Sequence, residues 1–136
     1  MSKKQLSRHL VNPRVVCKPY GPWSQAAVVD GERLMFISGQ VPVDEDGRLV
    51  GEGNFEKQVV KVFESLKVVL ASQQATFKEV VKLNIYMTDM ANRAKLNEVR
   101  SKYLKDAGFP ATTTIAVTSL ADPRYMVEIE AIAVLK

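Results

Sequence analysis

Two carboxylates near the C-terminus, Glu128 and Glu130, are the side chains whose type and spacing best suit chemistry. They lie two positions apart in a segment that alternates like a β-strand, so both should share one face of that strand. The same face carries Met126, Ile132 and Val134. A carboxylate among apolar side chains is costly unless it is paired or used, and a raised pKa would suit it to acid or base work with water. The alternative is that both carboxylates face solvent near a sheet edge or pair with a lysine.

Residue types argue against a His/Cys metal site and against a catalytic triad. His9 is the single histidine and Cys17 the single cysteine, so no His/Cys metal cluster can form. A catalytic triad would need His9, which lies in an N-terminal tail that we expect to be mobile. Neither the P-loop nor the G-x-G-x-x-G nucleotide motif is present.

The same composition predicts the compartment. A lone cysteine cannot form an internal disulfide and fits a reducing environment. Residues 1–14 lack the apolar stretch and cleavage site of a secretory signal, so we do not expect them to be one, and no apolar run reaches the roughly 18–20 residues that cross a bilayer. We therefore expect a cytoplasmic protein with no membrane partner.

The formal charge of +4 is unevenly distributed. Residues 1–18 carry five basic side chains and no acid, which leaves the remaining chain at −1. A nucleic-acid-binding domain should carry a basic face on its folded body. We expect one domain over residues 1–136 with a basic, partly flexible arm at 1–18. We favour a solvated tail over an RNA-binding segment for this arm, and we do not expect a nucleic-acid partner.

Hydrophobic periodicity predicts the element order β-β-α-β-α-β-β. The expected elements are a hairpin of strands 26–30 and 33–43 joined at Asp30-Gly31-Glu32, a helix at 54–73 capped by Asn54, a capping box from Thr76 to Glu79, a strand at 81–88, a helix at 92–106, and strands at 112–118 and 126–135 joined by a turn at 121–123. Two helices can cover one face of a mixed sheet, yet the strands are apolar on both faces. The second apolar face must therefore be covered by another protein surface, and another copy of the chain in a homo-oligomer is the simplest candidate.

Several further residues are candidates for binding a ligand. Ser38 and Gly39 bring a small polar group and backbone amides together, which suits a small anion. Trp23 follows a Gly-Pro pair and either caps a pocket or packs in a core or interface. Asn97 and Arg100 of the second helix are either ligand contacts or simple surface residues.

Taken together, five segments resemble the RidA (YjgF) family, which is also labelled endoribonuclease L-PSP. They are GPWSQA (21–26), SGQVPVDEDGRLVG (38–51), VVKLNIYMTDMANRAKLNEV (80–99), FPATTTIAV (109–117) and VEIEAIAV (127–134). The resemblance implies an α+β, chorismate-mutase-like fold with two helices on one face of the sheet. It also implies a homotrimer with ligand clefts between subunits. The implied activity is cofactor-free hydrolysis of a reactive enamine or imine to a carbonyl compound and ammonia.

The resemblance also assigns roles to residues. Glu128 stands at the glutamate that positions water, Ser38 and Gly39 at the Ser-Gly of the cleft, and Asn97 at an asparagine of the second helix. Trp23 replaces the usual tyrosine of the cleft. Two further substrate-binding positions hold Thr112, where an arginine is expected after Pro-Ala, and Thr114, where cysteine is frequent.

The threonine at position 112 limits how far the family activity carries over. A guanidinium–carboxylate contact contributes roughly 1.5–3 kcal/mol, whereas a neutral hydrogen bond contributes about 0.5–1.5 kcal/mol. A 2-imino acid should therefore bind about ten-fold more weakly or worse unless Arg100 or Arg124 replaces the charge. The alternatives to a hydrolase of altered substrate range are a non-catalytic small-metabolite-binding module and a ribonuclease or translation inhibitor.

Overall fold

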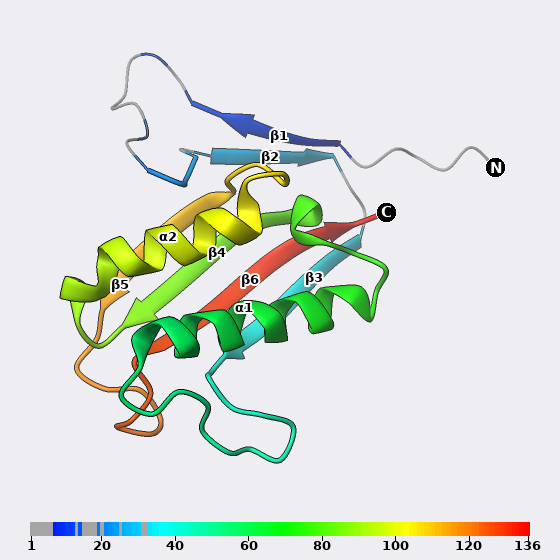
Figure 1. Ribbon diagram of the computed structural model, residues 1–136. Helices are drawn as coiled ribbons and strands as arrows, with labels where there is room; N and C mark the ends of the chain where they lie inside the picture. Colours follow the sequence, from blue (N-terminus) through cyan, green and yellow to red (C-terminus); the bar gives the residue numbers. More distant parts are fainter. Residues whose placement is uncertain (1–6, 13, 15–18, 20, 25, 31–32) are drawn as a thin grey trace.

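The C-terminal strand lies in the middle of the main sheet of this computed structural model (Figure 1). The structure describes residues 7–12, 14, 19, 21–24, 26–30 and 33–136. Its elements are β1 (Ser7–Val11), β2 (Ala26–Asp30), β3 (Arg33–Gln40), α1 (Phe55–Ala71), η1 (Phe77–Glu79), β4 (Val80–Met87), η2 (Met90–Asn92), α2 (Arg93–Leu104), β5 (Ala111–Ala116) and β6 (Val127–Leu135).

The main sheet has the strand order β3-β6-β4-β5. Strands β4 and β5 run parallel, while β6 is antiparallel to both of its neighbours, β3 and β4. Helices α1 and α2 lie side by side on one face of this sheet (Figure 1). The predicted α+β class, the mixed sheet and the placement of both helices on one face are therefore confirmed.

Helix α1 follows the predicted pattern. The side chain of Asn54 accepts a hydrogen bond from the Lys57 amide, so the predicted N-cap is confirmed. Seven side chains of α1 are buried against the sheet: Phe55, Gln58, Val59, Val62, Phe63, Leu66 and Leu70. The predicted capping box of η1 is also formed, because the Glu79 carboxylate accepts from the Thr76 amide.

Strand β4 and helix α2 complete the core. The buried residues of β4 alternate with half-buried ones as predicted, so that Leu83, Ile85 and Met87 face the helices. Phe63 of α1 stacks on Tyr103 of α2 with ring centroids 5.0 Å apart. Phe77 of η1 packs edge-on against the same tyrosine at 6.0 Å, which ties both helices to the start of β4.

Gln58 is a buried polar residue that the apolar pattern of α1 did not reveal. Its side chain is 0% exposed. Its Nε2 donates to the carbonyl oxygens of Gly51 and Arg124, and its Oε1 accepts from the Met126 amide. One side chain thereby fastens the loop before α1 to the turn that leads into β6.

The predicted hairpin between strands 26–30 and 33–43 is wrong. Strand β2 pairs with β1 in a separate two-stranded sheet, and β3 pairs with β6. The turn residues Gly31 and Glu32 lie outside the described residues. The local turn signal did not determine pairing, because the edges of β2 and β3 each find another partner in the tertiary structure.

Strand β1 lies within the segment that we expected to be a solvated arm. It includes His9, and the guanidinium of Arg8 donates to the carbonyl oxygens of Phe77, Val80 and Ala107. Burial lowers the pKa of Arg8, while the Glu79 carboxylate nearby opposes that shift. Residues 8–11 are thus held against the end of the main sheet. Cys17 lies outside the described residues.

The face of the main sheet opposite the helices exposes large apolar side chains. Leu34 and Phe36 of β3 lie on it beside Val134 and Ile132 of β6. Phe36 is 73% exposed, and Leu34 and Ile115 are also exposed. The predicted two-sided apolar character of β3 is therefore confirmed. No helix in the described part of the chain is long and apolar enough to cross a membrane.

We predict that Gln58→Ala lowers the free energy of unfolding by about 2–4 kcal/mol, because the Met126 amide and two carbonyl groups lose their buried partner. Denaturant unfolding of the variant and of Gln73→Ala measures the effect, since Gln73 is exposed. Equal stability of the two variants would contradict the structural role of Gln58.

Candidate functional site

Glu128 and Glu130 lie on the sheet face that the helices leave uncovered. In the register between β4 and β6, Glu128 lies opposite Tyr86 and Glu130 lies opposite Asn84. Their neighbours along β6, Val127, Ile129 and Ala131, are buried on the helix side. The predicted sharing of one strand face by the two carboxylates is confirmed.

The surroundings of Glu130 stabilise its charged form. Tyr86 Oη donates to Glu130 Oε1 at 2.6 Å, and Asn84 Nδ2 donates to the same oxygen at 2.9 Å. These two bonds lower the pKa of Glu130, whereas the pKa of Tyr86 is raised by its bond to the carboxylate. The raised carboxyl pKa considered from sequence is wrong for Glu130. This residue holds a fixed negative charge.

Glu128 packs against the backbone of β3 at Gly39. A Cβ atom at position 39 would lie 2.7 Å from Cδ and 2.9 Å from Cγ of Glu128. The strand register shifts between Ile37 and Gln40, so Ser38 and Gly39 occupy an irregularity in β3. The structure thus brings together three predicted site residues, Ser38, Gly39 and Glu128, which we call the Glu128 group. Ser38 is exposed and Gly39 is half-buried.

Thr112 and Thr114 lie on the opposite face of the sheet. They stand beside Leu83 and Ile85 of β4, whose side chains are buried under the helices. Both threonines are half-buried, and Thr112 Oγ1 donates to the carbonyl oxygen of Pro110 at 3.0 Å.

Trp23 lies close to the start of β5. The next residue, Ser24, forms a parallel bridge to Ala111, and its Oγ donates to the Phe109 carbonyl oxygen at 2.6 Å. Trp23 is half-buried. Trp23, Thr112 and Thr114, which lie on or near β5, are here called the Thr112 group.

Asn97 is engaged by Arg100 one turn further along α2. Arg100 Nη2 donates to Asn97 Oδ1 at 2.7 Å, and Asn97 is half-buried while Arg100 is buried. Arg124, the other cation considered from sequence, lies in the turn before β6. It donates to both carboxylate oxygens of Asp122 and lies 4.0 Å from Glu52 Oε1.

A single chain keeps the two groups apart. Thr112 of β5 pairs with Leu83 of β4, and Leu83 pairs with Ala131 of β6, so Thr112 lies two strand spacings from Ala131. Glu128 precedes Ala131 by three residues along β6. With about 4.8 Å between strands and about 3.3 Å per residue, the Cα atoms of Glu128 and Thr112 are about 14 Å apart. Their side chains also leave opposite faces of the sheet. Within one chain, Glu128 therefore lies apart from Thr112 and Thr114.

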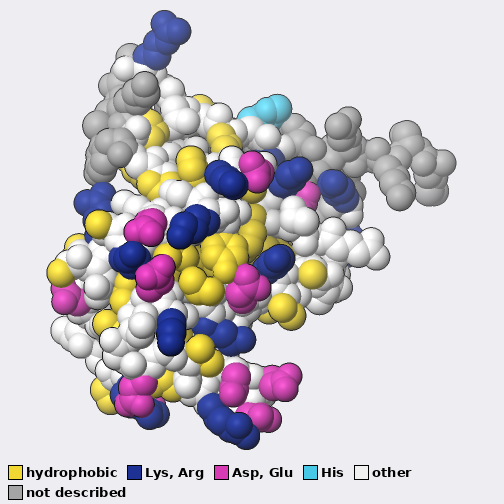
Figure 2. All heavy atoms as spheres, viewed as in Figure 1, with side chains coloured by type: hydrophobic (Ala, Val, Ile, Leu, Met, Phe, Trp, Pro, Cys, Tyr) yellow, Lys and Arg dark blue, Asp and Glu magenta, His cyan; other side chains and the backbone are white. Residues whose placement is uncertain are grey.

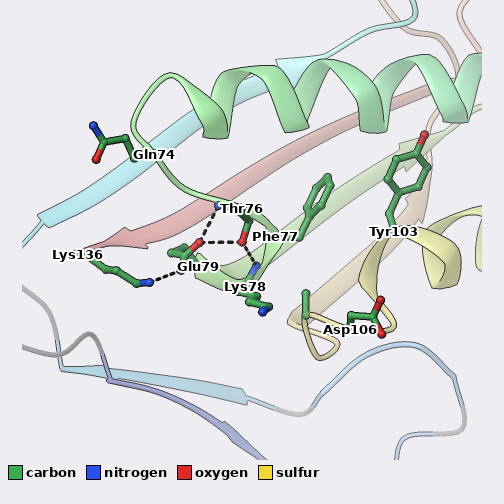
Figure 3. Close-up of a pocket in the computed structure, with 9 residues that line it drawn as sticks. Gln74, Thr76, Phe77, Lys78, Glu79, Tyr103, Asp106 and Lys136 are labelled. Carbon is green, nitrogen blue, oxygen red and sulfur yellow. Dashed lines mark hydrogen bonds and ion pairs between the residues drawn. The ribbon is translucent and has the colours of Figure 1, made fainter.

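A surface hollow of about 390 Å³ lies elsewhere, between η1, the end of α2 and the C-terminus (Figure 3). It contains none of the predicted site residues. The side chain of Glu79 is 8% exposed. It accepts hydrogen bonds from the amide and hydroxyl of Thr76 and forms an ion pair with Lys136 Nζ at 3.8 Å. Thr76, Glu79 and Lys136, which line the hollow, thus bind one another. Among the residues that the structure describes, no group of three His, Cys, Asp or Glu side chains is placed to hold a metal ion.

Sequence reasoning missed Asn84 and Tyr86 as partners of Glu130, although the signal was present. Both alternate with Leu83 and Ile85, which placed them on the uncovered face of β4. What the sequence lacked was the pairing of β4 with β6. Only that register brings a phenol and an amide to one carboxylate oxygen.

Comparison with known proteins identifies relatives along almost the whole chain. The profile of the family described as endoribonuclease L-PSP matches residues 14–135. Protein DfrA of Myxococcus xanthus is 38% identical over 132 residues, which is 96% of this chain and 98% of the relative. A RutC family protein of Aquifex aeolicus is 40% identical over 118 residues, covering 85% and 90% of the two chains.

Solved structures share the fold. YyfB of Yersinia pestis, a protein of unknown function in the conserved Rid family, is 33% identical with a TM-score of 0.88, covering 94% of this chain and 98% of that one. A structure from Thermotoga maritima is 40% identical with a TM-score of 0.70 over the same shares.

We predict that Tyr86→Phe raises the pKa of Glu130, because the phenol no longer stabilises the carboxylate. A lowered carboxyl pKa stabilises the fold above the ordinary carboxyl range, and this contribution fades as the pH falls through the folded pKa. Carboxyl carbon NMR titration measures the shift. Tyr103→Phe, which removes a phenol bonded to Glu64, is the control. A Glu130 pKa that is the same in both variants would rule out the proposed cause.

We further predict that Gly39→Ala displaces the Glu128 side chain and costs about 1–3 kcal/mol of stability, since the new methyl group overlaps the carboxylate. A crystal structure of the variant and its denaturant unfolding measure both effects. Gly21→Ala is the matched control, because its nearest contact is an ordinary 3.5 Å to Trp23. An unmoved Glu128 in Gly39→Ala would refute the contact.

Proposed function

Because the chain belongs to the RidA (YjgF, endoribonuclease L-PSP) family, we propose that it hydrolyses a small reactive enamine or imine in a cleft between two copies of the chain. The products are a carbonyl compound and ammonia. Glu128 is the residue that handles water. The observation that carries this proposal is the position of its carboxylate, on the uncovered sheet face against the Cβ-less Gly39.

The contrast between the two carboxylates supports the role of Glu128. Glu130 is held by Asn84 and Tyr86, which favour its charged form. The two donors to Glu130 do not bond to Glu128, whose carboxylate lies against Gly39. In the proposed reaction Glu128 accepts a hydrogen bond from a water molecule, while Glu130 supplies a fixed charge two residues away.

The proposed reaction needs one water and no redox step. Glu128 accepts a proton from water as the water oxygen bonds to the imine carbon, and passes this proton to the imine nitrogen to give a neutral carbinolamine. Glu128 then accepts the carbinolamine hydroxyl proton as the carbon–oxygen double bond forms and gives it to the leaving nitrogen, so that ammonia departs and the carboxylate is regenerated. The exposed Ser38 and the backbone of Gly39 line the same place and contact the reacting group.

The second half-site comes from a neighbouring copy. The Thr112 group lies about 14 Å from Glu128 and on the other face of the sheet, so one chain cannot close a cleft with both. The exposed apolar side chains Leu34, Phe36 and Ile115 favour association through the uncovered face. We propose a homotrimer in which Trp23, Thr112, Thr114 and Asn97 of one copy hold the ligand against Glu128 of the next.

A non-catalytic metabolite-binding module is the second candidate function. The observation that favours it is Thr112, whose hydroxyl is directed to the Pro110 carbonyl oxygen and offers a ligand no charge. Such a protein would keep the cleft and bind small metabolites without turnover.

Ribonuclease activity, which the family description names, finds less support in the charge distribution. Lys and Arg side chains are interspersed with Asp and Glu over the helix-covered face (Figure 2). Three exposed ion pairs of α1 and α2 join Lys95 and Lys102 to Glu56 and Glu98. A face of mixed sign offers little attraction to a phosphate backbone.

The test is hydrolysis of 2-aminoacrylate generated in situ, followed as ammonia or keto-acid release. We expect turnover above the buffer rate by the wild-type protein and at least a hundred-fold loss in Glu128→Gln, because general-base catalysis contributes about 10²–10⁴-fold. Glu98→Gln, on the exposed face of α2, is the control. No rate above buffer for any imine, with ligand-induced stabilisation intact, would select the binding module instead.

A further inference from the structure

Strand β3 has an edge that no other described strand covers. It ends the main sheet, where it pairs with β6 on one side and with no strand of the described ranges on the other. The strand is eight residues long, and its Leu34 and Phe36 side chains are exposed. Native proteins usually protect a long apolar edge strand, because its backbone N–H and C=O groups accept a further strand. Strand β3 is therefore suited to strand addition.

Strand β2 has an open edge as well. It pairs with β1 and with no other described strand, in a ribbon that lies across the end of the main sheet (Figure 1). Val28 in the middle of β2 is 49% exposed. A two-stranded ribbon is marginally stable by itself in water, so it gains stability from a third strand. One chain thus carries two strands that could each take a further partner.

The ribbon is fastened to the main sheet at a distance from β3. Ser24, two residues before β2, forms a parallel bridge to Ala111 of β5, and its Oγ donates to the carbonyl oxygen of Phe109. Arg8 of β1 donates to the carbonyl oxygen of Val80 at the start of β4. In the strand order β3-β6-β4-β5, strand β5 is the edge opposite to β3. These contacts therefore hold the ribbon beside β4 and β5.

The same attachment keeps β2 from the β3 of its own chain. In a hairpin joined at Gly31-Glu32, Ser24 would face Gly39 of β3. Ala111, which holds Ser24, lies three strand spacings of about 4.8 Å from β3, or about 14 Å away. Ser24 cannot occupy both places. A β2 that stays fastened at its own β5 therefore has its free edge available to another chain.

The sequences of β2 and β3 complement each other in that same antiparallel register. The facing pairs are Asp30 with Arg33, Val29 with Leu34, Val28 with Met35 and Ala27 with Phe36. One pair joins opposite charges and three pairs are apolar, which are favourable combinations across two strands. A shift of two residues would set the Asp30 carboxylate against Met35. The residue types thus select one register for β2 on β3, whichever chain supplies each strand.

We propose that β2 of one copy pairs with the free edge of β3 in a second copy, so that the main sheet continues from chain to chain. The ribbon stays fastened to its own β4 and β5, and β3 receives from a neighbour the strand that a hairpin would take from its own chain. Around three copies such head-to-tail contacts close a ring. The inference rests on the homotrimer of the proposed function and is independent of its chemistry.

This strand exchange also delivers Trp23 to the Glu128 group of the next copy. In the register above, Ser24 faces Gly39 of the second copy, and Trp23 lies one residue further along. Gly39 is the residue against which the Glu128 side chain packs. Within its own chain, Trp23 stays beside the start of β5. Main-chain pairing between copies therefore brings an aromatic ring of one chain to the carboxylate of another.

Disulfide cross-linking between two differently tagged copies tests the pairing. Both copies carry Cys17→Ser, which removes the native thiol, and one adds Ala27→Cys while the other adds Phe36→Cys. Facing residues of antiparallel strands have Cα atoms about 4.5–5.5 Å apart, which is within the range of a disulfide. We expect the co-expressed pair to form a mixed-mass disulfide dimer on mild oxidation.

Ile115→Cys in place of Phe36→Cys is the matched control. Ile115 is an exposed apolar residue opposite Tyr86 on the same sheet face, but it lies on β5 at the other edge. Association through apolar faces alone would cross-link both positions, whereas strand exchange cross-links Phe36→Cys only. If Phe36→Cys does not fold, Val29→Cys with Leu34→Cys tests the same register two residues along each strand.

Three results would overturn the proposal. They are no mixed-mass dimer from either cysteine pair, equal cross-linking of Ile115→Cys, and a disulfide confined to single chains in the double variant Ala27→Cys/Phe36→Cys. Glu128→Gln separates this failure from failure of the proposed hydrolysis, because it should lose imine turnover and still form the mixed-mass dimer. Copies that cross-link and hydrolyse no imine retain this inference and lose the enzymatic one.

Discussion

The register of β6 between β3 and β4 is the constraint on which the rest of this structure depends. It places Val127, Ile129 and Ala131 under the helices and sends Glu128 and Glu130 to the opposite face. Strand alternation has a period of two, so a slip of one residue would bury both carboxylates in the core and expose three apolar side chains. The same register sets Glu130 within reach of Tyr86 and Asn84 and sets Glu128 against Gly39. Packing of the core and placement of the acidic groups are thus decided together.

The polar side chains of the folded chain differ in how many of their hydrogen-bonding groups have a partner. Glu130 has two donors on one oxygen, and Gln58 uses both ends of its amide to join two loops. Arg100, by contrast, has one neutral partner and two unpaired nitrogens among the described residues. Buried polar groups in folded proteins are nearly always paired, so the exceptions point to function. Arg100 lies on the helix side of the main sheet, whereas Glu128 lies on the uncovered face.

Local sequence patterns predicted the elements well and their pairing poorly. The cap at Asn54, the capping box from Thr76 to Glu79 and the alternation of β4 all depend on residues within a few positions of one another, and all three are formed. The hairpin joining 26–30 to 33–43 also rested on a local signal, and it is not formed, because strand pairing is a competition among all available edges. Strand β1 went unrecognised for a related reason. Its stability comes from β2 and from Arg8 contacts with carbonyl groups more than sixty residues away.

The sequence by itself determined the family, the α+β class, the two helices on one face and the shared face of Glu128 and Glu130, since period and residue type are properties of the chain. It also named Ser38, Gly39, Asn97, Thr112, Thr114 and Trp23 without stating which of them meet. The tertiary structure alone decided that Thr112 and Thr114 lie on the sheet face opposite to Glu128, because only strand order and register fix which side chains are neighbours. It likewise gave different surroundings to two arginines that look alike in sequence. Arg124 has its anion in Asp122, whereas Arg100 is buried beside Asn97 with donors unpaired, because burial and pairing arise only when distant segments pack.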